Sequence, residues 1–227
     1  MAGGLKKEIR KWLNGIVYAV YLVYCRFCFG KNIRLIDLTK YKFAIVDKED
    51  YERLKIFKWR PRYCSNSWYA VRCRKVGEKK GNILVWMHNV ILPPPKGKMI
   101  DHRNHNGLNN RKSNLRIATR SENMQNRRKW KTPCSSVFKG VVHRNYHNRR
   151  KLWNGYISVN GRTICLGCFM TELEAAMAYD RAALKYHGEF ACLNFPRNKD
   201  KTRLSAIALR SFMRRKGRDE IPRQNKI

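Results

Sequence analysis

The chain has 227 residues, of which 50 are Lys or Arg and 16 are Asp or Glu, so its formal net charge is +34. Hydrophobic residues make up 43% of it and aromatic residues 11%, which is enough for packed cores and excludes an intrinsically disordered chain. A compact protein with this much positive charge repels itself unless a polyanion neutralises it. A nucleic acid is therefore the expected partner.

The 8 cysteines lie at irregular spacing and give no disulfide framework, which favours reduced thiols in a cytosolic protein. Two pairs are close in sequence, Cys25 with Cys28 and Cys165 with Cys168. They are weak candidates for zinc ligands. The second pair falls in a predicted strand, where a spacing of three points the two side chains to opposite faces.

Residues 1–32 differ in composition from the rest of the chain. Basic residues between positions 6 and 11 precede an apolar run from Ile16 to Cys25, which is shorter than the ~20 apolar residues that span a bilayer. A peripheral amphipathic helix, a membrane-directed leader and an extension absent from the working protein all fit this pattern. We favour an appended, non-catalytic segment and expect no stable membrane partner.

Residues 33–130 show the pattern of a globular α+β domain. Pro93 to Pro95, followed by Gly97, form a stiff connector within it. A helix is predicted to open at Asp47 and run to Trp59, ended by Pro61. Short apolar runs predict strands over residues 33–38, 42–46, 68–71, 83–87 and 99–102.

Residues suited to metal binding and proton transfer crowd the stretch from Met99 to Arg128. Asp101 offers an anionic oxygen and the neighbouring asparagines offer neutral carbonyl oxygens, a set that suits Mg²⁺ or Mn²⁺ better than zinc. His102 titrates near neutrality and suits a general base that takes a proton from water. The stretch therefore predicts a phosphodiesterase site with one metal ion.

A helix is predicted at the end of this stretch. Thr119 and Glu122 have capping-box spacing, so the helix should begin at Thr119 and carry Asn123 in its first turns. Arg127 would then share one helix face with Asn123.

The pattern resembles the HNH homing endonucleases of phages and mobile introns. The resemblance runs from about Ile33 to Arg128. It is carried by Asp101-His102, the run Asn104 to Arg111, Ser113 to Arg116, and Glu122-Asn123 with Asn126.

The resemblance implies the ββα-metal fold and a role for each of the central residues. His102 would stand on the second strand as general base, Asp101 and Asn123 would bind the metal, and Asn114 would orient the base. His88 matches a histidine that the family usually follows with arginine, whereas Asn89 follows it here.

A second module, residues 137–196, follows a linker at 131–136. Strands are predicted over residues 137–142, 153–159 and 162–169, with Asn160-Gly161 as a two-residue hairpin turn. Thr171 and Glu174 form a capping box that opens a helix, and Gly188 stops it. The expected architecture is a three-stranded antiparallel sheet packed on one helix.

Charge indicates which side of this module meets DNA. The helix carries Glu172, Glu174 and Asp180, so the more basic sheet should face the phosphates and enter the major groove. With two residues from the first domain, the candidate DNA-binding residues are Arg127, Arg128, Lys139, Arg144, Arg149, Arg150, Trp153 and Arg162.

The module resembles the Apetala-two/ethylene-response-factor DNA-binding domain. The matching residues are Phe138 to Val141, Trp153, Leu166-Gly167, Thr171-Glu172 with Glu174 to Ala176, Tyr179-Asp180, His187-Gly188 and Leu193 to Pro196. In that family, arginines of the first two strands and the tryptophan of the second touch DNA, which carries over to Arg144 and Trp153. Val142 stands where the plant pattern has arginine, so the plant target sequence is not expected; a core role for Trp153 is the alternative.

The tail, residues 197–227, is basic, and a short amphipathic helix over residues 204–213 is expected to lie on DNA or to be solvated.

The whole sequence indicates a cytoplasmic, metal-dependent endonuclease that acts on double-stranded DNA with one Mg²⁺ or Mn²⁺ ion and no small-molecule cofactor. The sequence does not indicate the oligomeric state. The alternatives are a transcription regulator with an inactive HNH unit and a basic RNA-associated protein.

Overall fold

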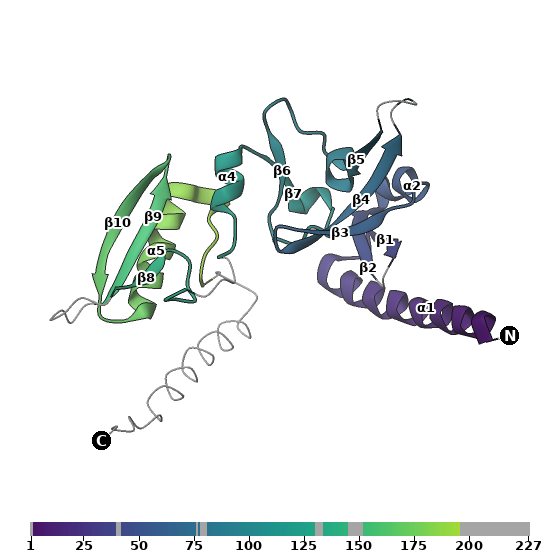
Figure 1. The fold of residues 1–227 in the computed structure, drawn as a ribbon, viewed down its shortest axis with the longest axis horizontal. Coiled ribbons are helices and arrows are strands. Elements are labelled where there is room, and N and C mark those ends of the chain that lie inside the picture. The colour runs from purple at the N-terminus through teal and green to yellow at the C-terminus, as the bar shows by residue number, and fades with distance from the viewer. Residues whose placement is uncertain are drawn as a thin grey trace, which may run out of the picture. The chain divides into compact units, whose positions relative to one another are not determined.

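The computed structural model describes residues 2–39, 42–75, 77, 81–129, 134–144 and 152–195, with side chains from residue 15 onward. The chain is α+β with several small antiparallel sheets, as its sequence indicates (Figure 1). It divides into two compact units, residues 1–123 and 124–227. The helix predicted in the tail and the candidate residues Arg149 and Arg150 lie outside the described residues.

Unit 1 opens with a long helix and then alternates short strands with short helices. In chain order these are α1 (Ala2–Phe29), β1 (Ile33–Thr39), β2 (Lys42–Asp47), α2 (Lys48–Lys55), β3 (Arg60–Cys64), β4 (Ser67–Lys75), β5 (Asn82–Trp86), α3 (Met87–Ile91), β6 (Met99–His102), the 3-10 helix η1 (Lys112–Asn114), β7 (Leu115–Ala118) and α4 (Arg120–Gln125). The boundary between the two units falls within α4.

Three antiparallel sheets form from these strands: β1 with β2, β3 with β4 and β5, and β6 with β7. The predicted strands are present, but Met87 opens α3 instead of ending a strand. The helix expected to reach Trp59 ends at Lys55, and Pro61 lies inside β3. A proline is tolerated there because β3 is an edge strand, where a missing N–H donor breaks no interior ladder.

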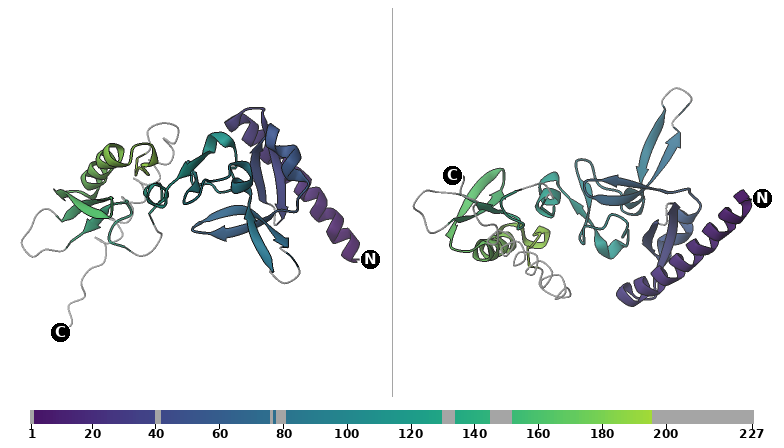
Figure 2. Two further views of the ribbon diagram at one scale, coloured as in Figure 1. Left: turned by 90° about the horizontal axis from the view of Figure 1, so that it is seen from above. Right: turned by 60° about the horizontal axis from the view of Figure 1, so that its bottom comes forward.

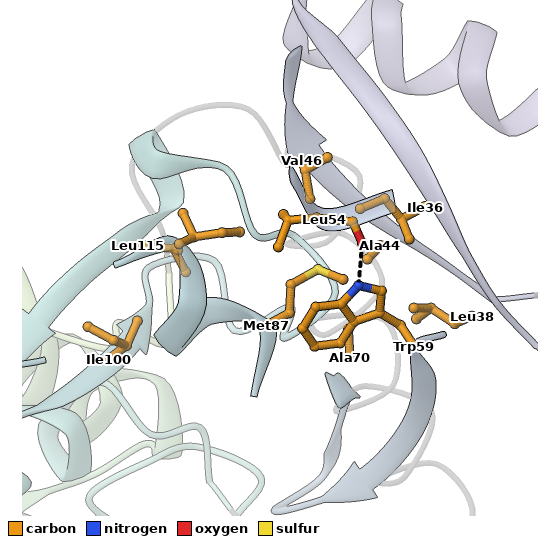
Figure 3. Close-up of a cluster of buried hydrophobic side chains, with 11 residues drawn as sticks. Ile36, Leu38, Ala44, Val46, Leu54, Trp59, Ala70, Met87, Ile100 and Leu115 are labelled. Atoms are coloured by element: carbon orange, nitrogen blue, oxygen red, sulfur yellow. Dashed lines mark hydrogen bonds between the residues drawn. The ribbon is translucent and has the colours of Figure 1, made fainter. Parts of the chain in front are cut away.

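The main core of unit 1 connects all three sheets (Figure 3). Within it the Trp59 indole N–H donates to the Leu54 carbonyl at 2.8 Å, so the buried polar atom of this ring is satisfied. Ile100 from β6 and Leu115 from β7 belong to the same cluster. The hairpin that carries the predicted catalytic residues is therefore fixed to the body of unit 1.

Helix α1 packs one side against the β1–β2 sheet and exposes the other (Figure 2). Its packed side places Tyr18, Tyr21, Leu22 and Cys25 in a cluster with Phe43. The exposed side includes the large apolar residues Val20, Val23, Tyr24 and Phe27. Within the described residues, neither α1 nor another helix has the length and apolar character needed to cross a membrane.

Unit 2 contains the end of α4 and a three-stranded antiparallel sheet in the order β10, β9, β8. Its further elements are β8 (Val141–His143), β9 (Trp153–Val159), β10 (Arg162–Phe169), α5 (Glu172–His187) and the 3-10 helix η2 (Gly188–Phe190). Asn160 and Gly161 both have positive φ, at 50° and 76°, as a tight hairpin turn requires. The predicted capping box of Thr171 and Glu174 is present at the start of α5.

The first strand of unit 2 is shorter than predicted, because it begins at Val141 and not at Val137. The preceding residues bond elsewhere: the Ser136 hydroxyl donates to the Glu172 carboxylate at 2.8 Å, and the Lys139 N–H donates to the Asn194 side chain at 2.7 Å. Gly140, at φ 74°, then turns the chain into the strand.

Two apolar clusters lie between this sheet and α5. Phe138 and Val141 pack on Ala175 and Ala176, and Ile157 packs on Tyr179 and Ala183. Gly140 sits against the Tyr179 ring so closely that an added Cβ would overlap it.

Gly140→Ala should lower the free energy of opening of unit 2 by about 2–4 kcal/mol, since it adds a left-handed backbone penalty to overpacking against Tyr179. Gly161→Ala is the matched control: its φ is also positive, but no atom lies within 4 Å of the added Cβ, so only about 1–2 kcal/mol is expected. Amide hydrogen exchange of β9 measures both values. Equal losses in the two variants would contradict the packing argument.

Candidate functional site

The antiparallel hairpin of β6 and β7 sets the directions of the central residues. Asp101 lies directly opposite Arg116 and His102 directly opposite Leu115. Opposed residues share a face and neighbours alternate, so Asp101 and His102 project from opposite faces at the end of one strand. Met99, two residues before Asp101, shares the Asp101 face.

Helix α4 follows this hairpin and begins where the sequence predicts. The Glu122 N–H donates to the Thr119 hydroxyl oxygen at 3.1 Å, and the Thr119 N–H donates to the Glu122 carboxylate at 2.7 Å. This reciprocal cap fixes the direction in which α4 leaves the hairpin. The Asn123 amide group then donates to the Met99 sulfur at 3.0 Å, which places Asn123 on the Asp101 face. Arg127 does not share a helix face with Asn123, because α4 ends at Gln125.

The Asp101 carboxylate is buried in an ion pair with Arg116. The guanidinium donates to Oδ2 from Nε at 2.8 Å and lies 2.7 Å from it through Nη2, and both side chains are at most 7% exposed. A carboxylate buried this deeply needs a compensating positive charge. The sequence did not single out Arg116, since the pairing becomes visible only once the strand register is known.

The His102 ring is enclosed on the other face of the hairpin. Its centroid lies 5.1 Å from that of His88 and 5.7 Å from that of Tyr69, and it is 5% exposed. Burial lowers the pKa of His102, while the hydrogen bond of the ring to the Asn110 side-chain oxygen and the charge of Asp101 act in the opposite direction. The ring is therefore neutral at neutral pH and able to accept a proton.

The Asn110 side chain indicates where the proton of the His102 ring lies. The ring Nε2 lies 3.2 Å from the Asn110 side-chain oxygen, and the amide nitrogen of Asn110 donates to the Gly107 carbonyl at 3.5 Å. That oxygen can only accept, so the ring proton belongs on Nε2. The sequence does not single out Asn110, although it lies in the asparagine-rich run from Asn104 to Arg111.

Asn114, predicted to orient His102, holds the connecting loop instead. Its side-chain oxygen accepts the Asn104 N–H at 3.1 Å, and its amide nitrogen donates to the Asn109 carbonyl at 2.7 Å. The loop is also joined to β2, where the Ile45 N–H donates to the Leu108 carbonyl at 2.8 Å. The Asn114 side chain thus holds the same loop that carries Asn110.

His88 is a buried neighbour of His102. Burial, followed by the effect of His102, lowers the pKa of His88 to about 3, so the ring stays neutral. Its Nδ1 has no hydrogen-bond partner among the described residues. His88 therefore supports the His102 ring by packing and is enclosed, so it does not contact DNA from the surface.

Two candidate DNA-binding residues of unit 2, Lys139 and Trp153, make contacts within the protein itself. The Lys139 ammonium donates to the carbonyls of Gln125 and Arg127 at 2.6 and 2.7 Å, and burial lowers the pKa of Lys139. Trp153 is half-buried against the cluster of Phe138 and stacks edge-on with His143 at 4.7 Å. These placements favour a packing role for both side chains.

The other described candidates are more accessible. Arg144 is exposed, with its guanidinium 5.6 Å from the Tyr156 ring, and Arg128 is exposed just beyond α4. Arg162 is exposed beside the hairpin turn, but it lies opposite Val159 and therefore on the α5 side of the sheet.

Cys165 and Cys168 lie on the same face of β10, contrary to the prediction. A bulge between Cys165 and Gly167 adds a residue, so that Cys165 is opposite Tyr156 and Cys168 is opposite Asn154, two positions apart on β9. Both thiols are free and exposed. Within the described residues, no group of three or more His, Cys, Asp or Glu could hold a metal ion.

Comparison with known proteins identifies the nuclease part. A family model described as HNH endonuclease matches residues 85–125, the segment from the end of β5 to the end of α4. An uncharacterised HNH endonuclease of Acanthamoeba polyphaga mimivirus is 30% identical over 160 residues, which cover 70% of this chain and 79% of the viral protein. No solved structure matches the chain significantly.

Plant proteins match a shorter stretch. The ethylene-responsive transcription factor WRI1 of Arabidopsis thaliana is 36% identical over 72 residues, which cover 29% of this chain and 17% of the plant protein. APETALA2-like protein 2 of Oryza sativa subsp. indica is 41% identical over 61 residues, which cover 27% of this chain and 13% of the plant protein. The chain therefore belongs to the HNH endonuclease family, and it combines the domain of that family with one like those of the AP2-like ethylene-responsive transcription factors.

Proposed function

We propose that this protein is a homing-type endonuclease that hydrolyses a phosphodiester bond of double-stranded DNA with the help of one divalent cation. The observation that carries the proposal is the neutral His102 ring, held through Nε2 by the Asn110 side-chain oxygen, at the end of the strand that also presents Asp101. Unit 2 would supply affinity and register, because contacts to phosphates position a protein and contacts to bases specify its site.

The residues on the Asp101 face fit a hard cation. Asp101 would contribute a carboxylate oxygen and Asn123 its amide oxygen. The amide nitrogen of Asn123 makes the contact to Met99, and the amide oxygen forms no hydrogen bond among the described residues. Oxygen donors of this kind suit Mg²⁺ or Mn²⁺, in keeping with the general dependence of HNH nucleases on a divalent metal. The bound ion would neutralise charge that develops on the phosphate and on the leaving 3′ oxygen. The expected ββα-metal arrangement is then β6, β7 and α4.

His102 would act directly on the attacking water. The ring would take a proton from the water while its Nε2–H stays hydrogen-bonded to the Asn110 side-chain oxygen, so the imidazolium that forms is hydrogen-bonded as it gains charge. His88 and Tyr69 hold the ring edge-on and exclude bulk water from it.

His102→Ala should reduce Mg²⁺-dependent nicking of a plasmid by about 10²–10⁴-fold, the usual contribution of a general base, with DNA affinity nearly unchanged. His105→Asn is the control, because it alters a neighbouring histidine at φ 62°, a backbone conformation that asparagine tolerates. Gel assays of nicking and anisotropy measurements of binding are the readouts. Unchanged cleavage by the His102 variant would remove this residue from the mechanism.

Asn123→Ala should weaken Mn²⁺ binding, followed by electron paramagnetic resonance without DNA, by roughly 10–100-fold because a direct ligand is lost. Ser121→Ala, an exposed position on the same helix, should bind Mn²⁺ like the wild type. The wild type is expected to bind one ion. Equal affinity in the two variants would place the ion elsewhere.

The ion pair of Asp101 with Arg116 favours the competing function, a DNA-binding regulator whose HNH domain is inactive, because the arginine already neutralises the expected metal ligand. Nicking by the purified wild-type chain with added Mg²⁺ decides between the two. A nuclease requires the carboxylate to remain accessible to the cation despite Arg116.

Arg116→Met should destabilise unit 1 by about 3–5 kcal/mol, since it leaves a buried carboxylate without its counter-charge. The double variant Asp101→Asn/Arg116→Met should recover much of that loss, because neither buried charge remains. Denaturant unfolding or hydrogen exchange in β6 measures the cycle. Additive losses would mean that the ion pair is energetically unimportant.

A further inference from the structure

The sheet of β3, β4 and β5 has two chemically different faces. On one face Ala70 joins the core of unit 1, and the Arg72 guanidinium lies 3.9 Å from the Phe57 ring. Strand alternation and register define the other, which we name the Tyr69 face. Its residues are Arg60, Arg62, Cys64, Ser67, Tyr69, Val71, Cys73, Lys75, Asn82, Leu84 and Trp86.

The Tyr69 face adjoins the polar loop that follows β6. The Tyr69 ring lies 5.7 Å from the His102 ring. The Ser67 hydroxyl donates to the His105 carbonyl at 3.2 Å and accepts the Gly107 N–H at 3.1 Å. Gly107 packs directly on Tyr69, with 2.5 Å between the ring and a Cβ added at that glycine. A molecule bound to His102 therefore has this sheet face beside it.

The outer part of the face is basic and unneutralised. Arg60 and Arg62 are exposed on the edge strand, opposite Val71 and Tyr69, and their guanidinium groups have no ion pair or hydrogen bond among the described residues. The sequences of β3, β4 and β5 contain neither Asp nor Glu. In both views of Figure 2, paired strands of this sheet project from the rest of unit 1.

We propose that the Tyr69 face, through Arg60 and Arg62, binds backbone phosphates of the duplex next to the bond that is cut. This inference rests on the proposed function and extends it, because it gives unit 1 its own DNA-binding surface beside the general base. Arginine suits the task, since its planar fork donates two parallel hydrogen bonds to one phosphate. The positive face and the anionic polymer are complementary, and a projecting antiparallel ribbon is a shape that fits a DNA groove.

The test compares two single substitutions in the full chain, Arg62→Gln on the Tyr69 face and Arg74→Gln, also exposed, on the opposite face of β4. Both remove one positive charge, so nonspecific loss of charge affects them equally. Affinity for a fluorescent duplex is measured by anisotropy over a range of salt concentrations.

The expected result is that Arg62→Gln weakens binding by roughly tenfold and that Arg74→Gln has little effect. The double variant Arg60→Gln/Arg62→Gln should reduce the slope of log affinity against log salt by about 2, one unit for each lost phosphate contact. Equal affinities and slopes for Arg62→Gln and Arg74→Gln would overturn the proposal.

Nicking by the same proteins separates this inference from the proposed function. If the wild type cuts DNA while the double variant binds and cuts equally well, the nuclease stands and the Tyr69 face is not its DNA contact. If the wild type does not cut but the double variant loses affinity, the surface stands and the nuclease fails. Both arginines are exposed, so unchanged thermal melting checks that the variants are folded.

Discussion

The cross-strand register of β6 and β7 determines what this protein can do, because it assigns Asp101 to one face of a hairpin and His102 to the other. A slip of one residue would exchange the two faces and bring the imidazole beneath α4. Two features hold the register: the buried ion pair of Asp101 with Arg116, and the packing of Ile100 and Leu115 in the core of unit 1. One expected cation ligand, Asp101, and the expected general base, His102, thus come from adjacent residues without competing for the same space.

The polar loop after β6 completes this arrangement. Buried asparagines stabilise a loop only when their polar groups have hydrogen-bond partners. In this loop most of those partners are backbone groups or His102. Asn109 and Asn110 are fully buried, Asn114 holds the loop from within, and the Asn110 N–H donates to the Ile45 carbonyl at 2.8 Å. The loop is thereby attached to β2 as well as to β4, so the orientation of His102 depends on contacts between residues far apart in the sequence.

The sequence predicts local features well and three-dimensional partners poorly. The caps at Thr119 and Thr171 and the Asn160-Gly161 turn were predictable, since each depends on residues only a few positions apart. The roles of Asn110 and Asn114 were not, because both carry the same amide and only the folded loop decides which meets His102. The bulge that places Cys165 and Cys168 together, the carbonyl partners of Lys139 and the pairing of Asp101 with Arg116 likewise depend on long-range register.

Asp101 and Asn123 share one face of the hairpin and are expected to bind the cation there. Paramagnetic broadening tests this most directly. Mn²⁺ broadens the nuclear magnetic resonance signals of atoms near it, so a substoichiometric titration of the isotopically labelled chain locates the ion residue by residue. The account predicts that the signals of Asp101 and the side-chain amide of Asn123 broaden first, while those of Cys165 and Cys168 remain sharp. Broadening that began at the cysteines, or anywhere away from the hairpin and α4, would contradict it.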